Sequence, residues 1–503
     1  MQQPSGVPQV IPGTGLPARG APVSDLQQAL ASGALTSAGL TAFYLERIRR
    51  LDPGLHAVIA VSAAAAADAL ASDAARAAGA VRGPLEGIPV LVKDNIAVAG
   101  MPVTAGSPAL LDTEPDDAFL VTRLRAAGAV IIGKANMSEW ANFRSTRSTS
   151  GWSTLGGQAV NPRGPGRNPS GSSSGSAVAV AAGLAPLAIG SETDGSIVCP
   201  ASACGVVGIK PTTGLVSRTG IVPISLAQDT AGPMAASVAD AAALLSVLAG
   251  VDSADPACRG FDGPSEREGV DYTDYLDPAA LAGARLGVWR AASADAGVAI
   301  EAVLDAAVAR LRGCGADVQD PADLPGAGQI EGPEFTAMLH EFKHDLNGYL
   351  SGLPGTHPAT LAELIAFNER NGNTVLARFG QEIFERAQAC SGDPADPVFI
   401  AARADATRLA RGALDEPLTA GRLDAVVALT ASPAWLTDYV LGDHDVFHTS
   451  TPAAVAGYPS VTVPAGEVAG LPVGLSFTGP RGSEPRLVAL AYAFEQAGQR
   501  GAT

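Results

Sequence analysis

Short apolar runs that alternate with helical segments limit the folds open to this chain. The runs at 87–92, 129–133 and 187–191 are bounded by glycine or polar residues, as buried strands are. Helical segments at 118–128 and 176–182 precede two of them. Because strands that alternate with helices pair into a sheet covered on both faces, the pattern predicts an α/β protein.

The rest of the chain extends this prediction. Residues 1–23 are rich in Pro and Gly and are expected to form an extended N-terminal arm. The segment 334–420 is predicted to be helical and is interpreted as an insertion near the functional site. No boundary is marked along 1–503, so one large domain is expected. Further elements are predicted towards the end of the chain: strands at 424–428, 460–464 and 472–477 and a helix near 484–497.

The charge and hydropathy of the chain argue against two classes of partner. Its 503 residues carry a formal net charge of −17 and no cluster of Lys and Arg, so nucleic acid is not expected to bind. The longest apolar stretch, at 177–190, is interrupted by Pro186 and is too short to span a membrane. The opening MQQPS lacks the pattern of a signal peptide, so we expect a protein that is either cytoplasmic or exported with its leader already removed. We also expect a monomer.

Lys93 ends an apolar run and is followed by two serine-rich turns. The first is PSGSSSGS at 169–176, and the second is SETDGSIVCPAS at 191–202, which contains Ser196. A serine attacks a carbonyl only when a base removes its proton, and burial makes a lysine amine available as that base. A second serine can relay the proton, because a hydroxyl both donates and accepts. The pattern indicates a serine hydrolase that needs no histidine.

Taken in order, these segments resemble the amidase signature family. The resemblance covers most of the chain and implies the fold of that family, a single large α/β domain whose central mixed sheet has helices on both faces. The matching segments are GIPVLVKDNI at 87–96, GKANMSEW at 133–140, NPSGSSSGSAVAVAAG at 168–183, SETDGSIVCPASACGVVGIKPT at 191–212, QDTAGPM at 228–234, GYPSVTVPAG at 457–466 and LPVGLSFTG at 471–479.

The resemblance also implies a role for each residue of the site. Lys93 stands at the family's catalytic lysine, and Ser196 at the serine that is acylated. Ser172 stands at the bridging serine, which the family holds in a cis peptide, and Ser173 at a supporting serine. The backbone that matches the oxyanion loop belongs to Thr193, Asp194, Gly195 and Ser196.

The activity implied by this resemblance is hydrolysis of a carboxamide to a carboxylate and ammonia through an acyl-enzyme. No cofactor and no metal are expected. The wording TDGSIVCPAS and the chain length are most similar to members that remove the C-terminal amide of peptides. Asp194, however, stands where many members have glycine, and SGSSSG at 170–175 replaces their GGSSGG pattern. The identity of the acyl group is therefore less constrained than the triad.

Two alternative enzymes and a non-catalytic scaffold remain open at this stage. His340, Glu341 and His344 fit the HExxH pattern of a zinc metallopeptidase, with Glu363 as a third ligand. Ser173 lies in a GxSxG match, and an α/β-hydrolase triad could be completed by Asp443 and His448. Lys343 inside the first motif favours a solvated helix, and GxSxG is frequent in serine-glycine loops.

Overall fold

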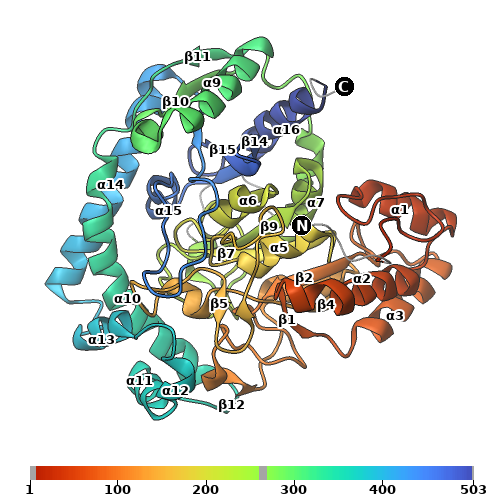
Figure 1. The fold of residues 1–503 in the computed structure, drawn as a ribbon, viewed down its shortest axis with the longest axis horizontal. Coiled ribbons are helices and arrows are strands. Elements are labelled where there is room, and N and C mark those ends of the chain that lie inside the picture. Colours follow the sequence, from red (N-terminus) through yellow and green to blue (C-terminus); the bar gives the residue numbers. More distant parts are fainter. Residues whose placement is uncertain (1–6, 260–268, 501–503) are drawn as a thin grey trace.

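A sheet of eleven strands forms the centre of the computed structural model, which describes residues 7–259 and 269–500 (Figure 1). The strands, in their order across the sheet, are β1 (Val58–Val61), β4 (Val130–Ala135), β2 (Pro89–Lys93), β7 (Leu187–Glu192), β9 (Thr230–Ala235), β8 (Val207–Lys210), β14 (Ser460–Val468), β15 (Leu471–Thr478), β13 (Ala425–Leu429), β10 (Arg285–Val288) and β11 (Asp317–Gln319). Two short pairs lie outside it: β3 (Asp112–Thr113) with β12 (Gly355–Thr356), and β5 (Trp152–Ser153) with β6 (Gly157–Gln158).

The sheet is mixed, as expected. Strands β4, β2 and β7 run parallel to one another, and so do β13, β10 and β11. The strands between these two groups pair antiparallel. Because β2 and β7 are parallel neighbours, their carboxyl ends meet at one edge of the sheet, and this edge carries the residues of the site described below.

Helices cover both faces of the sheet. On one face lie α7 (Val238–Leu248), α9 (Val298–Gly313) and α16 (Glu484–Arg500), and on the other α5 (Ser174–Ala182) and α6 (Val198–Cys204). Strand β15 shows this alternation, since side chains at odd and even positions point to opposite faces. The ring centroids of Phe477 and Phe494 of α16 are 5.8 Å apart, so Phe477 points to the face that α16 covers. A Cβ on Gly474 would lie 3.0 Å from Ser202 Oγ of α6, so position 474 points to the opposite face.

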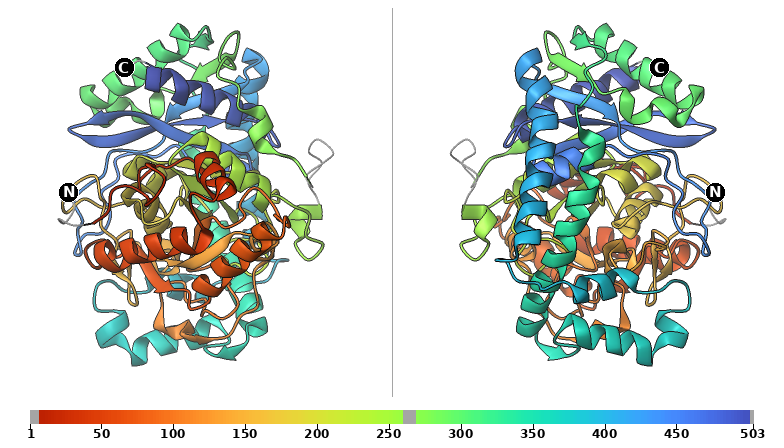
Figure 2. Two further views of the ribbon diagram at one scale, coloured as in Figure 1. Left: turned by 90° about the vertical axis from the view of Figure 1, so that its right-hand side faces the viewer. Right: turned by 90° about the vertical axis from the view of Figure 1, so that its left-hand side faces the viewer.

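The remaining helices pack around the sheet and the helices that cover it (Figure 1). They are α1 (Val23–Ser32), α2 (Ser37–Leu51), α3 (Ala65–Ala77), α4 (Phe119–Ala126), α8 (Pro256–Arg259), α10 (Glu331–Gly352), α11 (Leu361–Arg370), α12 (Gly372–Val375), α13 (Glu382–Ala389), α14 (Pro397–Gly421) and α15 (Thr451–Ala456). Helices α10 and α14 pack side by side along one flank (Figure 2). The segment 334–420 is thus helical, as predicted, while its interpretation as an insertion stays a prediction.

The N-terminal segment differs from the extended arm that was expected. Residues 7–22 are irregular, but the chain turns back on itself through a bridge between Val10 and Pro17. Ile11 is fully buried in the main core. The apolar residues among the prolines and glycines explain this packing, since burying them is favourable even without a regular element. Residues 1–6 lie outside the described part.

No helix in the described ranges combines the length and the apolar character needed to cross a bilayer.

Candidate active site

Lys93 is the last residue of β2 and is fully buried. The three preceding side chains of this strand, at 90–92, are also inaccessible to solvent, so the chain enters the site from the core. The Lys93 Nζ atom lies 2.8 Å from Ser172 Oγ, 2.9 Å from the Ser191 carbonyl oxygen and 3.0 Å from Ser191 Oγ. The amide of Asn95 donates to the same Ser191 hydroxyl at 2.9 Å.

Burial sets the protonation of this amine. Loss of hydration lowers the pKa of Lys93 from 10.5 to about 7, although the carboxylates of Glu192 and Asp229 act in the opposite direction. Charged lysine is favoured in water and disfavoured in a packed interior. A substantial fraction of the amine is therefore neutral at pH 7, as a base requires.

The first serine-rich turn is anchored to the carboxyl end of β7. Ser172 is fully buried and follows a cis peptide bond after Gly171. Ser173 Oγ donates to the Ser191 carbonyl oxygen at 3.0 Å and accepts from the Ser191 N–H at 3.2 Å. The Ser173 N–H donates to the Ser196 carbonyl oxygen at 3.1 Å. These bonds bring the two serine-rich turns together beside Lys93.

The second turn is a short loop between β7 and α6 that Glu192 closes. The Glu192 carboxylate accepts from the N–H groups of Ile197 and Val198 at 2.7 and 3.0 Å. Gly195 has a φ of 76°, and a Cβ there would lie 2.9 Å from both Cys199 Sγ and Ser450 Oγ, so only glycine fits. Ser196 is held at the end of this loop with 9% of its surface exposed.

Two side chains of the loop hold it to neighbouring segments. Thr193 Oγ1 donates to Asp229 Oδ1 at 2.5 Å, and burial raises the pKa of Asp229 to about 7. On the other side, the Asp194 carboxylate accepts from Ser450 Oγ at 2.6 Å and from Thr451 Oγ1 at 2.7 Å. Asp194 thus links the loop to the start of α15.

The structure adds polar groups that the sequence analysis did not single out. Ser191 supplies two of the three oxygen partners of Lys93, and Asn95 orients its hydroxyl. The signal for Ser191 was its position at the end of a predicted strand; that this strand runs parallel to that of Lys93 is seen only in the fold. Asp229, in the QDTAGPM segment, had no such signal, because its contact with Thr193 depends on the antiparallel pairing of β9 with β7.

The residues of the metallopeptidase alternative are engaged elsewhere. Glu341 forms an ion pair with Arg403 and accepts from Ser225 Oγ at 2.6 Å. The ring of His340 stacks on Phe399, and the exposed His344 lies 3.2 Å from the Gly392 carbonyl oxygen. Within the described ranges, no three His, Cys, Asp or Glu side chains gather closely enough to hold a metal.

The three residues of the α/β-hydrolase alternative do not form a triad. Ser173 bonds to the backbone of Ser191, as described above. Asp443 accepts from Ser150 Oγ at 2.5 Å, and His448 Nδ1 lies 3.2 Å from Asp445 Oδ2. Each side chain of the proposed triad therefore has a different partner.

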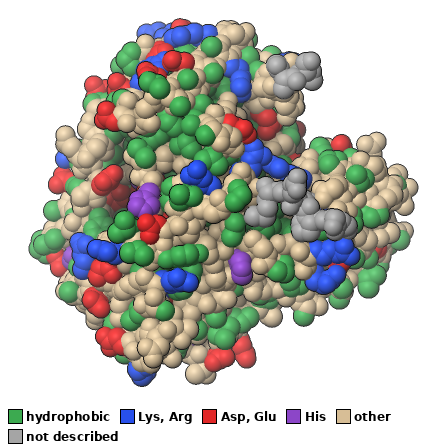
Figure 3. Space-filling view, viewed as in Figure 1, with side chains coloured by type: hydrophobic (Ala, Val, Ile, Leu, Met, Phe, Trp, Pro, Cys, Tyr) green, Lys and Arg blue, Asp and Glu red, His purple; other side chains and the backbone are tan. Residues whose placement is uncertain are grey.

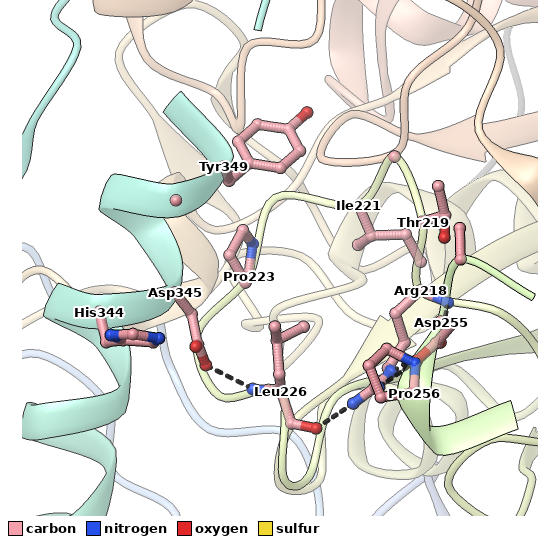
Figure 4. A pocket seen from close by; sticks show the side chains of 13 residues that line it. Arg218, Thr219, Ile221, Pro223, Leu226, Asp255, Pro256, His344, Asp345 and Tyr349 are labelled. Atoms are coloured by element: carbon pink, nitrogen blue, oxygen red, sulfur yellow. Dashed lines mark hydrogen bonds and ion pairs between the residues drawn. The ribbon is translucent and has the colours of Figure 1, made fainter. Parts of the chain in front are cut away.

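Two cavities are lined by residues other than Lys93, Ser172 and Ser196. One, of about 270 Å³, is bordered by Arg218, Asp345 and Tyr349 (Figure 4). The other, of about 250 Å³, extends towards Phe399. Leu226 lines both cavities, and its N–H donates to Asp345 Oδ2 at 2.7 Å.

Comparison with known proteins gives consistent results across the chain. A family model described as "Amidase" matches residues 39–488. A probable amidase of Arabidopsis thaliana is 40% identical over 487 residues, covering 95% of this chain and 90% of that protein. The native peptide amidase of Stenotrophomonas maltophilia is 51% identical with a TM-score of 0.90, covering 94% of this chain and 96% of its own. A structure of the peptide amidase PAM with the competitive inhibitor chymostatin is 50% identical with a TM-score of 0.91, covering 95% and 97%.

Proposed function

Because this chain belongs to the amidase family and is a hydrolase acting on amides, we propose that Ser196, Ser172 and Lys93 cleave the C-terminal carboxamide of peptides. The contact of 2.8 Å between the buried Lys93 amine and the Ser172 hydroxyl carries the proposal. This contact places the proposed base, Lys93, directly against the proposed proton relay, Ser172, with no histidine between them.

The hydrogen bonds around Lys93 accommodate a neutral amine. A neutral amine has two N–H groups and one lone pair. Two of its three neighbours, the carbonyl and the hydroxyl of Ser191, can accept the two N–H groups. The lone pair is then directed at the Ser172 hydroxyl, which donates its proton to Lys93 and takes one from Ser196. This transfer activates Ser196 as it attacks the amide carbon.

The backbone of the 193–196 loop supplies the oxyanion hole in this proposal. Within the described parts of the chain, the N–H groups of Asp194, Gly195 and Ser196 donate to no protein acceptor, so a substrate oxygen can accept from them. One donor of this kind contributes roughly 3–4 kcal/mol to stabilisation of the transition state. The Glu192 carboxylate preorganises the loop by binding the two N–H groups that follow it.

The remaining steps return the protons to the departing groups. The tetrahedral intermediate collapses, its C–N bond breaks, and the nitrogen leaves as ammonia with the proton that Lys93 and Ser172 hold. Water then loses a proton to the same relay and attacks the acyl-enzyme carbonyl. The C–O bond to Ser196 breaks, Ser196 regains its proton, and a carboxylic acid is released.

A panel of amides tests the peptide substrate. The similarity to peptide amidases at 50–51% identity supports it. We expect kcat/KM for an N-acetylated dipeptide amide to exceed that for a single amino-acid amide and for a fatty amide by at least about tenfold, because contacts remote from the reacting carbon contribute to transition-state binding. Ammonia release is the measurement, and faster turnover of the fatty amide would exclude the peptide assignment.

The pH dependence of the reaction tests the neutral amine. With the pKa of Lys93 at about 7, kcat/KM should fall about tenfold per pH unit below pH 7 and level off just above it, before any change that other groups cause at higher pH. Asp229 also has a pKa of about 7, so the profile is repeated with Asp229→Asn. If the fall in kcat/KM below pH 7 persists in this variant, it is assigned to Lys93. If the fall disappears, the pH profile no longer supports a neutral lysine base.

A further inference from the structure

A chain of hydrogen bonds runs from the loop before Ser196 to His448. Thr451 Oγ1 donates to Asp194 Oδ2 at 2.7 Å, and His448 Nε2 lies 3.4 Å from the same Thr451 oxygen. At the other end of the ring, His448 Nδ1 lies 3.2 Å from Asp445 Oδ2. On the face seen in Figure 3, histidine and acidic side chains gather at a hollow left of centre.

The direction of these bonds defines the charge of the imidazole. The hydrogen of the Thr451 hydroxyl is committed to the Asp194 carboxylate, so Thr451 can only accept from His448 Nε2. The Asp445 carboxylate likewise only accepts, so Nδ1 must carry a hydrogen too. An imidazole that donates from both nitrogens is a cation.

The surroundings of His448 support the same charge state. Burial lowers the pKa of His448, but the bond to Asp445 and the nearby carboxylates outweigh it and raise the pKa to about 9. The titratable groups that face the ring come from three elements. They are Asp445 of its own segment, Asp194 of the 193–196 loop, and Glu331 and Glu334 of α10.

A cation at this position can offset the repulsion between the Asp194 carboxylate and the negative charge that develops on the substrate. Negative charge accumulates on the substrate oxygen when Ser196 attacks, and the oxygen would be held by the backbone of the loop that carries Asp194. A carboxylate there opposes this charge, since like charges repel strongly in a partly buried site. Resting on the function proposed for Ser196, we propose that His448 is a positioning residue that offsets the charge of Asp194 through Thr451.

A double-mutant cycle tests this inference. His448→Gln keeps a hydrogen-bond donor near Thr451 but removes the charge. We expect kcat for a peptide amide to fall by about tenfold or more, with KM changed less than about threefold. In the Asp194→Asn background the same change should cost less than about threefold in kcat, because the charge to be offset is gone. Equal losses in the two backgrounds, or no loss in the parent, would overturn the proposal.

A matched histidine on the same segment serves as the control. His444 is exposed and bonds to Asp438 at 3.0 Å, so His444→Gln should leave kcat unchanged. Ser196→Ala is assayed in parallel. Activity in that variant would refute the proposed function, whereas an inactive Ser196→Ala with a fully active His448→Gln would refute this inference alone.

The pH profile keeps the inference testable if His448→Gln does not fold. In the unmodified enzyme kcat should decline as His448 loses its proton around pH 9. This decline should be absent from Asp194→Asn, while circular dichroism shows both proteins folded over the same range. An identical decline in both proteins would contradict the role assigned to His448.

Discussion

Replacing Ser196 with alanine is expected to reduce amide hydrolysis by about 10⁴-fold or more, because no other hydroxyl in the proposed relay can form the acyl-enzyme. The backbone bond from the Ser173 N–H to the Ser196 carbonyl oxygen survives the change. The free energy of unfolding should therefore change by less than about 1 kcal/mol. Ammonia release measures the loss, and thermal unfolding monitored by circular dichroism shows that the fold remains.

Intact mass adds a direct measurement of the same prediction. With a slowly deacylated amide, the parent protein should gain the mass of the acyl group and Ser196→Ala should not. Ser176 is the matched control, because it is buried in α5 and its hydroxyl donates to the Ile189 carbonyl oxygen at 2.9 Å. Ser176→Ala should retain acylation. A mass gain in Ser196→Ala would place the nucleophile elsewhere.

Replacing Lys93 with methionine is expected to lower kcat by about 10³-fold or more while the protein stays at least as stable as the parent at pH 7. Methionine fills a similar volume without a group that takes a proton. The stability follows from linkage, because a pKa lowered from 10.5 to about 7 corresponds to roughly 5 kcal/mol of unfavourable burial at about 1.4 kcal/mol per unit. This cost exceeds the net free energy contributed by the hydrogen bonds of Lys93, which are lost when methionine replaces it.

The sign of this linkage can be checked by pH. Below pH 7 the lysine is charged in both the folded and the unfolded protein, so the cost of burial is full. Between about pH 7 and 10.5 the unfolded chain binds the extra proton, so the cost declines as pH rises. The stability advantage of Lys93→Met should shrink over this range in urea titrations. A variant that loses both activity and stability would indicate that Lys93 has a structural role.

A second buried lysine provides the contrast. Lys134 lies on the neighbouring strand β4, and its Nζ is 3.4 Å from Asp94 Oδ1. Lys134→Met would leave that carboxylate buried without its cation, which typically costs about 3–5 kcal/mol. The two substitutions are chemically identical. We expect Lys93→Met to lose activity without losing stability, and Lys134→Met to lose stability. This contrast distinguishes a lysine that acts as a base from one that acts as a structural cation.

The strands that could be predicted are those with a strong local signal. The apolar runs that become β2, β4 and β7 are bounded by turn residues, and their pattern is sufficient without tertiary contacts. Strand β9, with the sequence TAGPMA, has neither alternation nor a continuous apolar run. It lies between β7 and β8, and only pairing on both sides makes it a strand. The N-terminal segment likewise received its buried position from the core and not from its own propensity.

The candidate triad could be proposed from the sequence because its chemistry depends on residue types in a recognisable order, Lys93 before Ser172 and Ser196. Local patterns were enough to predict strands β2 and β7, whereas the parallel pairing that brings their carboxyl ends to one edge was found only in the fold. Whether the Lys93 amine is dehydrated depends on atoms packed around it from several strands, and only the tertiary structure decided this. The same holds for Asp194, whose partner Ser450 is 256 residues away. Desolvation and hydrogen bonds over such separations exist only after the chain has folded, so no local pattern encodes them.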